Sequence, residues 1–272
     1  MVKNCTQSRY DSGIVAVKSN VTAGLPGSPL RPTSLTIIIP AYNEQSRLPG
    51  TLDRIIGYMQ TAGWKEWEIV VVDDGSSDGT AEVADAIHQA NRRVRVLRNP
   101  GNRGKGYAVR HGMLDSQMDW RLISDADLSA PIEELDKLWN AVKGGTASVA
   151  IGSRALDRSL IGVHQPGFRE TAGKVFNFVM RAFIGLHLRD TQCGFKLFRG
   201  DVAKQVFERQ QIERFGFDVE ALFVAQKLGF RIAEIPIRWN HVEGSKVGML
   251  NGAQSFLDLV KIRWCQMSGR YR

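Results

Sequence analysis

The chain has 272 residues, 43% of them apolar and 24% charged, which is ordinary for a globular protein long enough to bury one large core. The formal net charge of +8 favours an anionic partner, such as a nucleic acid, an anionic membrane surface or a phosphorylated substrate. No apolar run reaches the roughly 20 residues that a membrane-spanning helix needs, and the three scattered cysteines predict neither a disulfide framework nor a zinc site.

Residues 1–34 are rich in Ser, Gly, Pro and Thr and lack the pattern of a secretory signal, so we predict a mostly disordered tail. From residue 35 onward, short β-branched runs alternate with helical patterns, which is typical of βαβ units. The pattern predicts an α/β fold, with a Rossmann-like, mainly parallel sheet and helices on both faces. The expected strands are 35–40, 67–73, 93–98, 119–124 and 147–152, and the expected helices are 46–62, 78–91, 104–117 and 131–143.

The alternation ends after residue 152, and the polar stretch that follows indicates a functional or disordered loop. We expect one domain over 35–249 and a basic amphipathic helix over 250–272. That helix combines apolar residues such as Trp264 with basic ones such as Lys261, so it either lies in a membrane interface or packs on the core with its basic end in solvent. The other elements expected here are a helix at 170–186, an extended segment at 194–199, a helix at 217–228, a strand at 230–239 and a helix at 250–267.

The most informative motif is the pair Asp125 and Asp127, which directly follows the apolar run 120–123. Two carboxylates one residue apart at the end of a strand can hold Mg²⁺ or Mn²⁺ while the open positions of the cation take diphosphate oxygens. An isolated Asp-x-Asp is more often a solvated turn. Its position after a strand, with two further acidic loops upstream, favours the functional interpretation.

Those two loops follow the first two expected strands. Asp73 and Asp74 end one strand, where a carboxylate can accept hydrogen bonds from a base or a ribose hydroxyl. Pro40, Tyr42 and Glu44 end the other, where they could form the wall of a nucleotide site. Part of each loop is explained by helix capping alone. Because carboxyl ends of parallel strands meet at one sheet edge, where such sheets bind ligands, we expect all three loops to converge.

Cations complete the candidate site. Lys105 lies in a glycine-rich segment at the expected start of a helix, an arrangement that resembles a phosphate cradle but lacks the spacing of an ATP-binding P-loop. Arg154, Arg169 and Lys246 lie in loops of the second half. Each alone is most often a surface charge, but loop cations beside an acidic metal site could bind a second anion, such as an acceptor phosphate.

Together these motifs resemble family 2 glycosyltransferases, which have the GT-A fold. The segments 40–44, 72–80 and 125–127 match the donor-site pattern of that family in order and spacing. The segments 102–106, 190–196 and 239–246 are similar to the dolichyl-phosphate glucosyltransferase branch. The related mannosyltransferases often carry Gln where this chain has Ser129 and an Arg where it has His241 and Val242, so a GDP-mannose donor is less favoured.

The resemblance implies a role for each site residue. Pro40, Tyr42, Glu44, Asp73 and Asp74 would contact the nucleoside, and Lys105 would help to bind the donor. Asp125 and Asp127 would place a divalent cation, Mg²⁺ or Mn²⁺, on the diphosphate and carry catalysis. The phosphates of donor and acceptor would be held by Arg154, Arg169, Ser245 and Lys246.

The leading hypothesis is therefore an inverting transfer of glucose from UDP-glucose to a polyprenyl phosphate by a peripheral protein at the cytoplasmic face of a membrane. A GDP-mannose donor or another family 2 product is the close alternative. A nucleic-acid-binding protein is disfavoured, because no basic stripe is interleaved with aromatic residues. An inactive scaffold is disfavoured by the intact aspartate pair.

Overall fold

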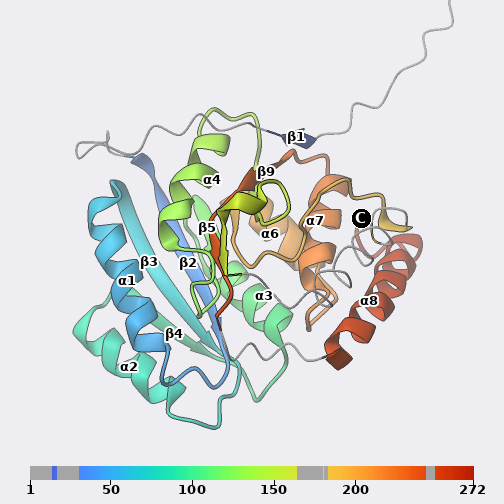
Figure 1. Cartoon of the computed structure of the whole chain (residues 1–272). Helices are drawn as coiled ribbons and strands as arrows, with labels where there is room; N and C mark the ends of the chain where they lie inside the picture. The colour runs from blue at the N-terminus through green and yellow to red at the C-terminus, as the bar shows by residue number, and fades with distance from the viewer. Residues whose placement is uncertain (1–13, 17–30, 164–179, 181–182, 243–248) are drawn as a thin grey trace, which may run out of the picture.

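The structure is a computed structural model that describes residues 14–16, 31–163, 180, 183–242 and 249–272 (Figure 1). An eight-stranded sheet crosses the molecule in the order β1-β9-β6-β8-β5-β2-β3-β4. A two-stranded sheet pairs β7 (Ile161–Val163) with β10 (Trp239–Asn240). The strands of the large sheet are β1 (Ile14–Ala16), β2 (Arg31–Ala41), β3 (Trp64–Asp73), β4 (Val94–Arg98), β5 (Trp120–Ile123), β6 (Val149–Ser153), β8 (Lys196–Arg199) and β9 (Ile232–Pro236).

Helices cover both faces of the large sheet, as the sequence predicted (Figure 1). Successive strand residues point to opposite faces, so Ile37 and Ile39 pack with α1, α2 and α4, whereas Ile38 packs with α3, α6, α7 and α8. Both clusters are fully apolar and buried, and together they form the core. The helices are α1 (Leu48–Thr61), α2 (Thr80–Ala90), α3 (Lys105–Asp115), α4 (Leu135–Val142), α6 (Gly200–Arg209), α7 (Phe217–Lys227) and α8 (Met249–Met267), with short 3₁₀ turns η1 (Ile132–Glu134) and η2 (Arg158–Leu160).

The direction of the strands decides which loops meet. β5, β2, β3 and β4 are parallel neighbours, with Ile38 opposite Ile123 and Pro40 opposite Val72. β8 lies between β5 and β6 and is antiparallel to both, so β6 again runs parallel to β5. The carboxyl ends of β2, β3, β5 and β6 and the amino end of β8 therefore share one edge of the sheet.

Several elements differ from the sequence-based expectation. β2 begins at Arg31, four residues before the expected strand, and the expected strand 230–239 divides into β9 and β10. Helix α6 was missed, although Val202 and Val206 recur at helical spacing and are buried. The expected helix 170–186 lies mostly outside the described residues. Most of the predicted tail 1–34 lies outside them as well, but its described residues 14–16 form β1, which pairs with β9. None of the described helices has the length and hydropathy that a bilayer crossing requires.

Candidate active site

The loops after β2, β3 and β5 converge at the shared edge and are tied together. Asn43 donates its backbone N–H to Ser76 Oγ (2.9 Å) and accepts from the backbone N–H of Ser77 at Oδ1 (2.8 Å). Asn43 has φ of 53°, a left-handed conformation that Asn tolerates better than most residues. Thr51 of α1 donates from Oγ1 to the carbonyl of Ala126 (2.6 Å), which fixes the loop after β5. The predicted convergence of these loops is therefore observed.

Asp74 is buried and its carboxylate organises the neighbouring loop. Its Oδ1 accepts from Asn99 Nδ2 (2.8 Å) and the backbone N–H of Arg103 (3.1 Å), and its Oδ2 accepts from the backbone N–H of Gly104 (2.7 Å). Asp73 accepts the backbone N–H of Ser76 at 3.2 Å. Asp74 thus shapes the glycine-rich segment that leads into α3, a role that sequence reasoning missed. Its contact with a nucleoside stays a prediction.

Lys105 begins α3 and forms an ion pair with Asp125. Its Nζ lies 2.6 Å from Asp125 Oδ1. Burial alone would lower the pKa of Lys105, but the carboxylates of Asp125, Asp218 and Asp127 outweigh that effect and raise it above the ordinary value. The lysine is therefore cationic, and its ion pair joins the glycine-rich segment to the predicted metal ligand Asp125. Sequence reasoning placed Lys105 in the donor site but did not foresee its pairing with Asp125.

Asp127 is half-buried in the tight turn that follows β5. Its Oδ1 accepts the backbone N–H of Ser129 at 2.9 Å, and Leu128 between them has φ of 47°. In the part of the chain that the structure describes, no group of three or more Asp, Glu, His or Cys residues is arranged to hold a metal ion. The metal ligands that the sequence predicts are the two carboxylates of Asp125 and Asp127, and that role stays a prediction. This donor set suits a hard cation such as Mg²⁺, which is commonly bound by one or two carboxylates together with substrate phosphates and water.

Gly194 lies directly against the carboxylate of Asp125. A Cβ at this position would be 2.1 Å from Asp125 Oδ2 and 2.4 Å from Cγ, so a larger residue would displace the aspartate. The glycine precedes the amino end of β8, which the antiparallel direction of that strand brings to the site. Lys196 of β8 is completely buried and donates from Nζ to the carbonyl of Cys193 and to Asp218 Oδ1. These contacts fix the turn that contains Gly194.

Arg154 follows β6 at the same edge, but its guanidinium is already bound. Nε and Nη2 donate to the two carboxylate oxygens of Asp190, at 2.7 and 2.8 Å. Burial would raise the pKa of Asp190, but Arg154 beside it holds that pKa below the ordinary value. The guanidinium also lies 5.3 Å from the ring of Trp239. A phosphate bound at Arg154 would therefore meet an ion pair rather than an isolated cation.

The remaining predicted residues are placed as follows. Pro40 is half-buried in β2, and Tyr42 is 36% exposed in the loop after it. Glu44 accepts from Arg47 Nη1 at 2.8 Å. The other predicted phosphate-binding residues, which are Arg169, Ser245 and Lys246, lie outside the described residues.

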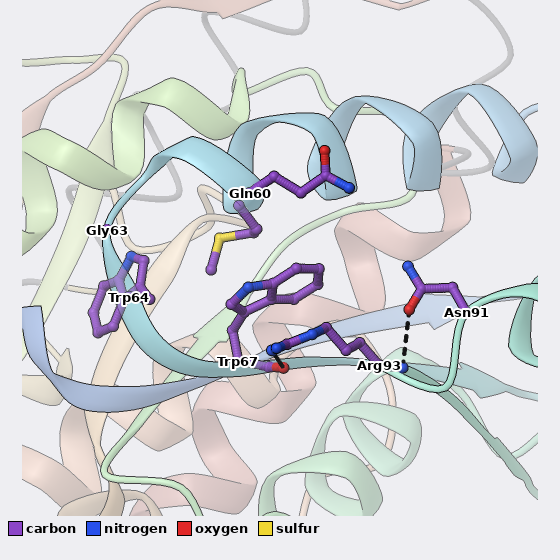
Figure 2. A pocket seen from close by; sticks show the side chains of 7 residues that line it. Gln60, Gly63, Trp64, Trp67, Asn91 and Arg93 are labelled. Carbon is purple, nitrogen blue, oxygen red and sulfur yellow. Dashed lines mark hydrogen bonds between the residues drawn. The ribbon is translucent and has the colours of Figure 1, made fainter. Parts of the chain in front are cut away.

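A pocket of about 440 Å³ lies at the opposite edge of the sheet, near the amino ends of β3 and β4 (Figure 2). The guanidinium of Arg93 lies 4.7 Å from the ring of Trp67 and donates to the carbonyl of that residue at 3.2 Å. No carboxylate lines this pocket. It therefore lacks the acidic side chains that gather at the carboxyl ends of β2, β3 and β5, a region that we call the acidic edge. Its walls are Met59, Gln60, Gly63, Trp64, Trp67, Asn91 and Arg93.

The protein has a mainly parallel sheet with acidic loops gathered at the ends of β2, β3 and β5, and it shares a GT-A-like glycosyltransferase fold with its solved structural neighbours. Residues 36–207 match the sequence model of the family described as Glycosyl transferase family 2. The chain belongs to that family, which confirms the resemblance seen in its motifs.

Its relatives include proteins named dolichyl-phosphate beta-glucosyltransferase. The protein of that name from Homo sapiens is 36% identical, with 88% of this chain and 77% of the relative covered. One from Trichomonas vaginalis is 35% identical, with 84% and 72% covered. Among solved structures, glucosyl-3-phosphoglycerate synthase from Mycobacterium tuberculosis, in complex with Mn²⁺, UDP-glucose and phosphoglyceric acid, has a TM-score of 0.62, 17% identity and coverage of 85% and 80%. At that identity the likeness shows the fold alone.

Proposed function

We propose that this protein transfers glucose from UDP-glucose to a dolichyl-type polyprenyl phosphate at the cytoplasmic face of a membrane. The observation that carries the proposal is the similarity to dolichyl-phosphate beta-glucosyltransferases, which extends over 84–88% of the chain at 35–36% identity. The acidic edge supports it, because a carboxylate pair beside the half-buried cations Lys105 and Arg154 suits the joining of two phosphate-bearing substrates.

The chemistry needs no dedicated general base. A polyprenyl monophosphate is mostly dianionic at neutral pH, since its second pKa is about 6, as for phosphoserine. One of its oxygens can attack the anomeric carbon directly, whereas a hydroxyl acceptor would first have to lose a proton. The new bond joins the phosphate oxygen to the anomeric carbon as the bond from that carbon to the UDP oxygen breaks. A single displacement of this kind inverts the anomeric centre.

The site residues have defined tasks in this proposal. Asp125 and Asp127 would hold a divalent cation, which when bound neutralises charge on the departing diphosphate. Lys105 is poised to donate to the donor phosphates, and its ion pair with Asp125 keeps the carboxylate charge balanced before the donor binds. Arg154, held rigid by Asp190, presents its remaining N–H groups at the end of β6. A fixed guanidinium positions an anion with little loss of side-chain entropy.

A donor panel tests the proposal. The protein is incubated with Mn²⁺, a polyprenyl phosphate and UDP-glucose, GDP-mannose or UDP-galactose, and the lipid-linked product is identified by mass spectrometry. We expect a hexosyl phosphate lipid from UDP-glucose, with its anomeric configuration opposite to that of the donor. Turnover of GDP-mannose alone would reject the glucose assignment, and retention of configuration would reject the single displacement.

Gly194→Ala is expected to lower kcat by roughly 100-fold, because a misplacement of about 1 Å at a catalytic group has an effect of that order. The added methyl would overlap the Asp125 carboxylate and push it out of the site. The measurement is steady-state glucosyl transfer together with a thermal melt. Gly57→Ala on α1 is the matched control, because a Cβ there meets no atom within 4 Å. A Gly194→Ala protein with unchanged kcat would show that Asp125 does not depend on this contact.

A further inference from the structure

Helix α8 exposes an unusual number of large apolar side chains. In the described part of the chain, six such residues are exposed, and four of them lie on this helix. Their spacing of three, four and three residues places them on one side of an α-helix, which we call the α8 outer face. The α8 outer face consists of Leu257 (63% exposed), Val260 (58%), Trp264 (51%) and Met267 (79%).

The opposite side of α8 packs in the hydrophobic core. Leu259, Ile262 and Cys265 are at most 2% exposed and pack in the cluster that includes α7. Beyond the helix, the Tyr271 hydroxyl donates to Glu220 Oε1 of α7 at 2.6 Å, which anchors the end of the chain. The helix is therefore docked on the core by its inner side and is apolar on its outer side as well. An exposed apolar patch of this kind marks a surface that contacts a second protein or a membrane.

A second segment extends the same surface. Phe183 is 42% exposed, and the guanidinium of Arg263 on α8 lies 5.8 Å from its ring. Aromatic rings with a basic group beside them suit the boundary between lipid tails and headgroups, where one end is apolar and the other polar.

The basic residues around the α8 outer face favour a partner with negative charge. The chain carries no Asp or Glu after Asp258, whereas its cations there are Lys261, Arg263, Arg270 and Arg272. The guanidinium of Arg270 lies 4.6 Å from the ring of Trp264, so basic and apolar groups share this surface. Symmetric pairing with a second copy would bring these cations together, and such like-charge contacts are costly. An anionic bilayer offers both the apolar interior and the negative charge.

We propose that the α8 outer face inserts into the headgroup region of an anionic bilayer, with Phe183 beside it and the flanking cations on lipid phosphates. Because α8 is docked on the catalytic domain, this contact would fix the orientation of the domain on the membrane. The inference concerns how the protein sits on lipid and does not depend on the identity of the sugar donor.

Co-sedimentation of the full chain with vesicles tests the proposal. The vesicles are phosphatidylcholine alone or phosphatidylcholine with about one third phosphatidylserine. The test variant is Leu257→Gln with Met267→Gln, at the two most exposed positions. We expect the wild-type chain to bind the anionic vesicles, less so at high salt, and the variant to bind at least ~10-fold more weakly. The matched control is Ala86→Gln with Ala90→Gln, at two exposed positions of α2, and it should bind as the wild type does.

Folding and catalysis are followed separately. The melting temperature of the double variant, and its transfer of glucose to a short, water-soluble polyprenyl phosphate, should match the wild type, because neither position touches the acidic edge. Equal vesicle binding by the variant and wild type would overturn the proposal. The proposal would also be overturned if the wild-type chain did not bind vesicles, or if it formed a dimer that the variant does not form. Vesicle binding is measured without donor, so it can fail or succeed independently of the proposed glucosyl transfer.

Discussion

Asp127→Asn is expected to lower kcat/KM for glucosyl transfer by about 10²–10³-fold or more, the range seen when a single electrostatic stabiliser of a transition state is removed. The substitution keeps an oxygen that can accept the backbone N–H of Ser129, so the turn after β5 should persist. It removes the negative charge that a divalent cation requires of its ligand. Steady-state assays across a Mn²⁺ titration, with thermal melts of both proteins, provide the measurement.

Two controls accompany this variant. Asp53→Asn makes the same chemical change at an exposed position of α1 and should leave the rate unchanged. Treatment of the wild-type protein with EDTA should abolish turnover, and added Mn²⁺ should restore it. Full activity of Asp127→Asn, or activity that survives EDTA, would remove the cation from the proposed mechanism.

The fold was predictable because its signals are local. Runs such as 69–72 are β-branched and bounded by turn residues, and the helical pattern between them requires parallel crossovers. That topology alone brings the ends of β2, β3 and β5 to one edge, which is why the sequence predicts that the acidic loops meet there. Helix α6 was not predicted, because its helical periodicity extends over only 10 residues directly after an apolar strand.

The finer geometry of the site was not predictable, because it depends on contacts between distant segments. β8 enters the sheet between β5 and β6 in the antiparallel direction, and no local pattern specifies such a pairing. Its entry brings Gly194 against Asp125, a contact across 69 positions of sequence. The pairing of Arg154 with Asp190 likewise depends on how the loops pack. A sequence motif predicts which residue types form a site. The charge state of those residues depends on neighbours that are distant in the sequence, as Asp190 is from Arg154.

Asp218→Asn is expected to lower the free energy of unfolding by about 3–5 kcal/mol, the usual result of removing one partner from a buried ion pair. The side chains of Lys196 and Asp218 are 1% and 7% exposed, and their N–O distance is 2.5 Å. Without the carboxylate, the lysine is left as an uncompensated buried charge. Urea unfolding gives the free energy. Asp201→Asn, which breaks the exposed pair with Arg199, is the matched control and should change it by ~1 kcal/mol or less.

Replacing both partners separates stability from function. Lys196→Met with Asp218→Leu leaves no unpaired charge and should recover most of the lost stability, since apolar replacement of a buried pair is often neutral. The double variant still lacks the ammonium that binds the carbonyl of Cys193, next to Gly194. We therefore expect it to fold stably but to turn over at least ~10-fold more slowly, because the turn that supports Asp125 is no longer held. Recovery of both stability and kcat would assign the pair to folding alone, whereas recovery of stability alone would give the Lys196–Asp218 pair a positioning role at the acidic edge.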